Sequence, residues 1–264
     1  MTIWVHLVRV RVPHVSAALR FVKRAKCFII QAMRVRALHE WNVSGPRARA
    51  IQLRLAKEVV TETEVVNARL VAGVDISPPD SQSVARGAVV VLGYPEFNVV
   101  EVSIAEAKIT LPYIPGLLSF RESPLILAAC EKLGHTPDLL LVDGQGIAHP
   151  RRFGLASHVG LFLDLPTIGC AKSILCGQHG PVEQEAGSCS ELLDSGEVIG
   201  AALRTKFRVR PIYVSIGHKI DLASALQWVM KCCRGYRLPE PTRLAHQAAA
   251  GRLAFEPELS SQVV

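Results

Sequence analysis

The order of apolar and polar positions predicts strands in the first half of the chain. Residues 70–77 form an apolar run, and a turn at 78–80 ends it because its two prolines cannot donate hydrogen bonds to a sheet. Residues 87–92 and 99–107 are further strand-like segments, separated by a Gly-Tyr-Pro turn at 93–95. Three strands joined by short turns indicate an antiparallel meander.

Helical periodicity precedes these strands and later alternates with further ones. Apolar residues recur at three- and four-residue steps over 45–59, which is typical of an amphipathic helix. The same reasoning predicts helices over 117–133 (broken or kinked by Pro124), 155–163, 223–233 and 242–250, and strands over 138–143, 167–171, 198–203 and 211–215. Residues 180–195 receive no assignment. Strands first, then helix and strand in alternation, predict an α/β fold with a mixed sheet flanked by helices.

The basic charge is concentrated at the N-terminal end. The 264 residues carry a formal net charge of +7, but residues 1–39 contain eight Lys or Arg and no acid. Without those eight, 22 basic and 23 acidic side chains remain, so the net charge says little about nucleic-acid binding by the rest of the chain. We therefore expect a basic extension at 1–38, one folded domain at 39–252 and a tail at 253–264.

The basic extension has several interpretations. It lacks an apolar span of ~18 residues, so no membrane helix is expected. No small-residue cleavage site follows its apolar stretch, which argues against a secretory signal. An arginine-rich, acid-free composition is typical of a transit peptide, whereas a translation start near Met33 would remove the extension.

Cysteine usage indicates a reduced, cytoplasmic protein. The seven cysteines include no CxxC pair and no paired Cys/His ligand spacing, and Cys232 and Cys233 are adjacent. We expect neither a disulfide framework nor a structural zinc site. No surplus apolar stripe or heptad seam stands out, so a monomer is the expected state.

Two apolar strands end in an aspartate. Asp143 follows residues 139–142 and precedes Gly144, where another part of the backbone can come close, and Asp75 closes the run that begins at Leu70. If the two carboxylates face one another at a sheet edge, they form an oxygen site suited to Mg²⁺. The alternative is that each aspartate only caps the amides of the following turn.

Other side chains are candidates for the same site. Glu122 lies near the start of the helix over 117–133, where the positive end of the helix dipole favours an anion. His218 would add a ligand or act on a leaving group. The alternatives are a solvated helix residue for Glu122, a hydrogen-bonded structural histidine for His218 and a packing residue for Tyr113. Spacing alone therefore supports a metal-dependent phosphodiester enzyme only weakly.

Six short stretches, taken in order, make the pattern more specific. They are 71–77 (Val-Ala-Gly-Val-Asp-Ile-Ser), 112–122 (Pro-Tyr-Ile-Pro-Gly-Leu-Leu-Ser-Phe-Arg-Glu), 142–151 (Val-Asp-Gly-Gln-Gly-Ile-Ala-His-Pro-Arg), 166–173 (Pro-Thr-Ile-Gly-Cys-Ala-Lys-Ser), 214–218 (Val-Ser-Ile-Gly-His) and 237–246 (Arg-Leu-Pro-Glu-Pro-Thr-Arg-Leu-Ala-His). Together they resemble the endonuclease V (deoxyinosine 3′ endonuclease) family. The resemblance runs from about residue 39 to about residue 247 and excludes the basic extension.

The resemblance implies a ribonuclease H-like fold and a DNA repair nuclease that depends on Mg²⁺, for which Mn²⁺ can substitute. Members of this family act on strands that contain deaminated adenine (inosine). They cut the second phosphodiester bond on the 3′ side of the inosine and leave 3′-hydroxyl and 5′-phosphate ends. Two alternatives stay open: an inosine-specific endoribonuclease of the same fold, and a protein that binds the lesion without cutting.

Position by position, the resemblance implies a role for each candidate. Asp75 and Asp143 match the metal-binding aspartates and Glu122 the catalytic glutamate. Lys172 matches a lysine near the scissile phosphate, and His218 matches the histidine near the metal. The implied catalytic residues are Asp75, Glu122, Asp143, Lys172 and His218. The family has a proline where Ile216 stands here, which loosens the loop that carries His218.

A second group is implied to recognise the lesion. Tyr113 matches an aromatic wedge that enters the helix where the damaged base leaves, and the prolines on either side of it stiffen its loop. Gly116 and Gly144 have no side chains, so backbone groups there can read the edge of the expelled base. The implied contacts are Tyr113, Ile114, Pro115, Gly116, Leu117 and Gly144, with Arg151 and Arg152 expected on the phosphate backbone.

Overall fold

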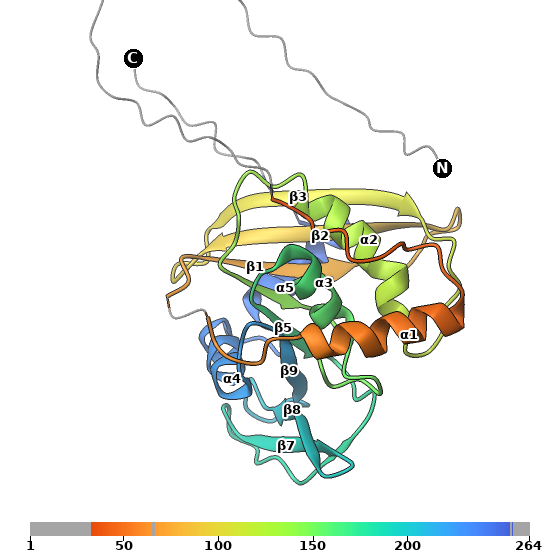
Figure 1. Cartoon of the computed structure of the whole chain (residues 1–264). Coiled ribbons are helices and arrows are strands. Elements are labelled where there is room, and N and C mark those ends of the chain that lie inside the picture. Colours follow the sequence, from red (N-terminus) through yellow and green to blue (C-terminus); the bar gives the residue numbers. More distant parts are fainter. Residues whose placement is uncertain (1–32, 65–66, 254, 256–264) are drawn as a thin grey trace, which may run out of the picture.

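The described part of the chain is a mixed sheet flanked by helices (Figure 1). The computed structural model describes residues 33–64, 67–253 and 255. Within these ranges, the strands are β1 Leu70–Ile76, β2 Val84–Gly93, β3 Val99–Lys108, β4 Leu139–Val142, β5 Thr167–Ala171, β6 Gln178–His179, β7 Cys189–Asp194, β8 Glu197–Leu203 and β9 Ile212–His218. The helices are α1 Gly45–Leu55 with a 3₁₀ turn at Ala56–Glu58, α2 Leu118–Cys130, α3 Leu155–Leu163, α4 Leu222–Lys231 and α5 Glu240–Ala249. The predicted α/β class is confirmed. None of the described helices is long and apolar enough to cross a membrane.

The directions of the strands decide which strand ends meet. The sheet has the order β3-β2-β1-β4-β5-β9-β8-β7-β6. β1, β2 and β3 form the predicted antiparallel meander, whereas β1 pairs in parallel with β4, and β4 with β5. The carboxyl ends of β1, β4 and β5 therefore share one edge of the sheet. β9 runs antiparallel to β5, so its carboxyl end lies at the opposite edge.

Alternating side chains along the strands bury both faces of the sheet. On β1, Val71 joins the apolar cluster under α4 and α5, whereas Ala72 and Val74 join the cluster under α2 and α3. α1 packs outside α2 and α3 through a smaller cluster that includes Leu55 and Phe120. Because both faces are covered near the centre, the strand ends are where polar side chains reach solvent.

The folded domain begins earlier than predicted. Met33 is buried against the cluster under α2 and α3, and the Arg36 backbone N–H donates to the Phe162 carbonyl (2.7 Å). Residues 33–38 therefore belong to the domain that was predicted to start at residue 39. The remainder of the predicted basic extension, residues 1–32, and most of the predicted tail lie outside the described residues.

Three local features differ from the predictions made from the pattern. Pro124 lies inside α2 and does not break it, and most of the helix residues after it are buried. β9 continues to His218 instead of ending at Ser215. The unassigned region contains β7, which pairs with the two-residue strand β6 just before that region, and only Leu192 among the residues of these two strands is buried. Strands with so few buried apolar positions leave little periodicity in the sequence.

Candidate active site

Asp75 and Asp143 lie beside one another at the shared edge of β1 and β4. Val74 is paired with Val142 in the parallel register, so the next residue of each strand emerges at the edge. One ligand atom from each of Asp75, Asp143 and His246 lies within 4.8 Å of the others. The two aspartates thus come together because each follows directly after the last parallel pair of β1 and β4.

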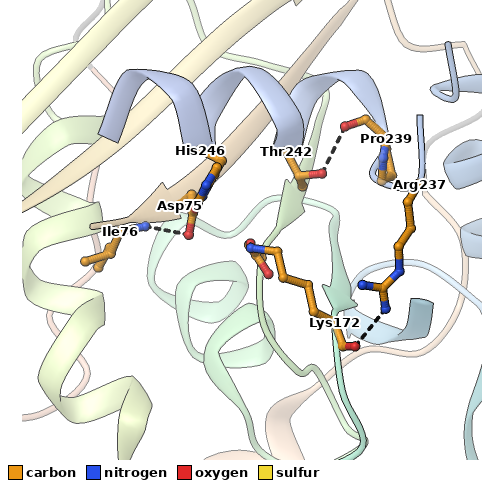
Figure 2. A network of polar contacts seen from close by, with 8 residues as sticks. Asp75, Ile76, Lys172, Arg237, Pro239, Thr242 and His246 are labelled. Atoms are coloured by element: carbon orange, nitrogen blue, oxygen red, sulfur yellow. Dashed lines mark hydrogen bonds and ion pairs between the residues drawn. The ribbon is translucent and has the colours of Figure 1, made fainter. Parts of the chain in front are cut away.

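His246 reaches Asp75 from α5 (Figure 2). Its Nδ1 lies 2.7 Å from a carboxylate oxygen of Asp75. This approach depends on Gly73, two residues before Asp75 on the same face of β1, because a Cβ there would lie 1.8 Å from the Pro241 carbonyl oxygen in the first turn of α5. His246 ends one of the six stretches, but no role was predicted for it. Its position at the end of that stretch was the available signal.

Burial and mutual repulsion perturb the carboxyl groups. Burial, and then the Asp75 carboxylate, raise the pKa of Asp143, whereas the Lys172 ammonium opposes that rise. Burial, and then Asp75, also raise the pKa of Glu122 to about 7. The neighbouring Arg121 lowers that pKa, but Asp143 adds to the rise. The raised pKa values of Asp143 and Glu122 indicate that carboxylates lie close together here with too little positive charge between them.

This donor set fits a divalent metal ion. Asp75 and Asp143 offer oxygen ligands and His246 offers a nitrogen ligand, each from a different element of the fold. Divalent cations such as Mg²⁺ and Mn²⁺ bind carboxylates and would neutralise the local excess of negative charge. Glu122 approaches the same edge from α2, where it lines a groove together with Ile76.

Lys172 follows β5 and its ammonium contacts the Asp143 carboxylate. The main chain of Lys172 is held in turn by Arg237, whose Nη2 donates to the Lys172 carbonyl (2.8 Å) (Figure 2). The same guanidinium donates to the carbonyls of Arg210 (3.0 Å) and Pro211 (2.8 Å). With 41% of its side chain exposed, Lys172 can reach an anionic group that approaches this edge.

Residues 112–117, called here the Tyr113 loop, border the same edge between β3 and α2. Tyr113 is 63% exposed, whereas Leu117 at the other end of the loop is buried. Tyr113 lines the groove that also contains Ile76 and Glu122. The edge that carries Asp75, Asp143 and Glu122 is called here the acidic edge. The exposed Tyr113 side chain therefore lies beside the acidic edge, where it is free to contact a ligand.

The two arginines predicted to hold a nucleic-acid backbone are engaged within the protein. Arg151 donates from Nη2 to the Gly116 carbonyl (2.6 Å) and from Nε to the Gln52 side chain (2.6 Å). Arg152 forms ion pairs with two acids of the β7–β8 turn (2.7 and 2.9 Å). Arg151 thus supports the Tyr113 loop and Arg152 supports that turn, and their contact with a backbone stays a prediction.

His218 lies away from the acids, so the prediction that placed it beside the metal is wrong. As the last residue of β9 it pairs with Thr167, the first residue of β5, at the opposite edge of the sheet. Its Nδ1 accepts a hydrogen bond from the Val60 N–H (3.2 Å), and its Nε2 faces Asp164 (3.7 Å). The antiparallel direction of β9 explains the difference, and the histidine beside the acids is His246.

Comparison with known proteins points to one family. The family model described as Endonuclease V matches residues 53–247. An endonuclease V from Gloeobacter violaceus is 54% identical over 213 residues, which cover 80% of this chain and 87% of the relative. An endonuclease V from Dehalococcoides mccartyi is 51% identical, with 83% of this chain and 98% of the relative covered.

Solved structures give the same result. The crystal structure of endonuclease V from Streptomyces avermitilis aligns with a TM-score of 0.77 at 38% identity and covers 84% of this chain and 97% of that one. Endonuclease V from Ciona intestinalis aligns with a TM-score of 0.67 at 27% identity and covers 79% of this chain and 98% of that one. The Ciona protein was crystallised with a 23mer DNA that contains an inosine followed by a ribo-adenosine.

Proposed function

Because this chain belongs to the endonuclease V family and is therefore an endonuclease, we propose that it is a Mg²⁺-dependent DNA repair enzyme directed at inosine. It cuts the second phosphodiester bond on the 3′ side of the inosine and leaves 3′-hydroxyl and 5′-phosphate ends. The observation that carries the proposal is the convergence of Asp75, Asp143 and His246 at a sheet edge that the Tyr113 loop borders.

Each residue at the edge has a distinct part in this chemistry. Asp75 and Asp143 would hold the cation, and His246 fixes the orientation of the Asp75 carboxylate. Bound Mg²⁺, or Mn²⁺ in its place, would supply positive charge for the phosphate and would lower the pKa of an attacking water. Glu122, with its pKa near 7, can accept a proton from that water at neutral pH. The Lys172 ammonium offsets charge that develops on the phosphate.

Recognition of the lesion falls to the Tyr113 loop. Inosine pairs imperfectly, so taking it out of the stack costs less free energy than for a normal base. Tyr113 fills the gap, and Ile114, Pro115 and Leu117 of the same loop shape it. The backbone N–H of Gly116 and the backbone of Gly144 read the edge of the expelled base. Gly144 packs against the Leu155 side chain, which would lie 3.1 Å from an added Cβ, so the segment after Asp143 is held close to α3.

The test is nicking of an inosine-containing duplex by the purified full chain with MgCl₂, next to a duplex with adenine at the same position. We expect one product, cut downstream of the inosine, and none after addition of a chelator. The matched control is Asp143→Ala, which should fold and should not cut. Equal cutting of both duplexes would contradict the specificity, and cutting by Asp143→Ala would contradict the site.

A second candidate is cleavage of inosine in RNA. The observation that favours it is the ribo-adenosine that follows the inosine in the Ciona complex. Matched DNA and RNA oligonucleotides, compared at equal enzyme concentration, separate the two. A larger kcat/KM on RNA would make the chain an endoribonuclease with the same catalytic edge.

The proposed working state is a cytoplasmic monomer. The described cysteines, residues 130, 170, 176, 189, 232 and 233, are free thiols, which suits a reducing compartment. Light scattering of the purified chain, alone and with an inosine duplex, measures its mass in solution and so tests whether it is a monomer. A mass of two chains in either sample would overturn it.

A further inference from the structure

Gln52 is a polar residue in an otherwise apolar position. It is 0% exposed, and the other buried residues of α1 are Ala48, Ile51 and Leu55. A buried amide destabilises a fold unless its groups are hydrogen-bonded. All of them are bonded here: Nε2 donates to the carbonyls of Gly116 (3.0 Å) and Phe153 (3.3 Å), and Oε1 accepts from Arg151 (2.6 Å).

The Gly116 carbonyl collects three donors from two other parts of the chain. Gln52 donates from α1 (3.0 Å), and His149 Nε2 (3.0 Å) and Arg151 Nη2 (2.6 Å) donate from the segment after β4. The direction of the His149 bond follows from its other ring nitrogen, since Nδ1 accepts from the Arg151 N–H (3.1 Å). A carbonyl oxygen has two lone pairs, so this one is fully used.

The backbone at Gly116 suits this convergence. Its φ of +77° lies in the left-handed region that glycine adopts readily. An added Cβ would also lie 2.6 Å from Arg151 Nη2. The backbone conformation at Gly116 therefore allows all three donors to reach its carbonyl. Gln52 is the donor that does not come from the segment after β4.

We infer that Gln52 is a positioning residue that fixes the Tyr113 loop relative to the catalytic acids. The segment that carries His149, Arg151 and Phe153 begins at Asp143, so Gln52 binds the loop and the acid-bearing segment at the same time. Without Gln52, Gly116 keeps donors only from that segment, and Arg151 loses the acceptor that orients its guanidinium. The inference rests on the proposed function, because it assigns the loop to the lesion.

Two variants and a matched control test the inference. Gln52→Met keeps the volume and removes every hydrogen bond. Gln52→Glu keeps an acceptor for Arg151 but removes both donors, and it is the variant to use if Gln52→Met does not fold. Ile51→Ala is the control, because Ile51 is the buried neighbour on α1 and contributes only apolar packing.

The experiment measures KM and kcat on an inosine duplex together with the fluorescence of 2-aminopurine placed 3′ to the inosine, which rises when the base unstacks. For both Gln52 variants we expect KM to rise on the order of tenfold, as for loss of one or two hydrogen bonds, with a smaller change in kcat. The increase in 2-aminopurine fluorescence should become smaller in the same variants. Ile51→Ala should lower the Tm and leave KM and the fluorescence as in wild type.

The outcomes separate this inference from the proposed function. If wild type unstacks and nicks the inosine duplex and the Gln52 variants do both equally well, the inference fails and the proposed function stands. The inference also fails if the Gln52 variants only match Ile51→Ala in every readout. If wild type neither unstacks nor nicks the duplex, the proposed function fails and the inference fails with it.

Discussion

The acidic edge and the Tyr113 loop lie beside one another, because Glu122 and Tyr113 line one groove, but they are held by different kinds of contact. Asp75 and Asp143 take their positions from the backbone hydrogen bonds of β1 and β4, whose residues before the acids are almost all fully buried. The Tyr113 loop belongs to no strand or helix, and side chains hold it through the carbonyl of Gly116. One region is positioned by the sheet and the other by a few side-chain hydrogen bonds.

This difference separates two kinds of functional change. A change at the acidic edge removes chemistry while the surrounding strands stay in place, so a substrate can still bind. A change in the Tyr113 loop, or in the side chains that donate to its Gly116 carbonyl, leaves the acids intact. Substrate that still binds in the correct position is therefore still cut.

Removing one charge at the acidic edge should have the largest effect. Asp143→Asn removes the charge of a proposed metal ligand, so we expect nicking to fall on the order of 10³-fold or more, while binding of the inosine strand persists. The Tm should not fall, because the substitution also relieves repulsion between two close carboxylates. Single-turnover nicking measures the rate, fluorescence anisotropy measures binding of the inosine strand, and thermal melting measures the Tm. Loss of binding together with nicking would contradict the division between the regions.

Moving α5 should have the next largest effect. In Gly73→Ala the new Cβ meets the Pro241 carbonyl, so α5 must shift and carry His246 away from Asp75. We expect roughly 10- to 100-fold slower nicking and a loss of about 1–3 kcal/mol in the free energy of unfolding, as for an overpacked core. Gly45→Ala is the matched control, because an added Cβ there finds its nearest neighbour at 3.9 Å. Equal behaviour of the two variants would show that the position of α5 is not critical.

The case of α5 shows what the sequence can predict. The helices and strands with continuous buried faces were predictable, and two of them, residues 155–163 and 167–171, coincide with α3 and β5. Both aspartates were predictable too, because each ends an apolar run. The sequence did not predict which strand each helix packs against, since the 3.6-residue period reveals a buried helix face but not the element that covers it. His246 was therefore overlooked as a neighbour of Asp75.

Strand direction was the other missing information. The apolar run of β9 looks the same whether it runs parallel or antiparallel to β5, because period and burial do not depend on direction. The antiparallel pairing carries His218 to the edge opposite the acids. β6 and β7 could not be predicted for a different reason, since only Leu192 among their residues is buried.

Removing the exposed Tyr113 ring should have a smaller effect, which is limited to binding of the inosine strand. Tyr113→Ala removes a side chain that is 63% exposed, so the Tm should stay within about 1 °C of wild type because little packing is lost. We expect binding of the inosine strand to weaken roughly 5- to 100-fold, the range for one base stacked on an aromatic ring. Tyr113→Phe is the control and should retain binding, since the ring face is kept. An unchanged affinity in Tyr113→Ala would remove the loop from lesion recognition.

The smallest effect is expected at the histidine that the sequence alone placed beside the metal. His218→Asn keeps an acceptor for the Val60 N–H, which His218 Nδ1 now binds at 3.2 Å, so the local main chain should stay in place. Because His218 ends β9 at the far edge, kcat and KM should change by less than about twofold, as for a substitution away from the site. His246→Asn, measured beside it, should slow nicking at least tenfold, because an orienting partner of Asp75 is lost. The reverse order of the two effects would mean that the metal is bound at the other edge of the sheet, and would overturn the assignment of the active site to the ends of β1 and β4.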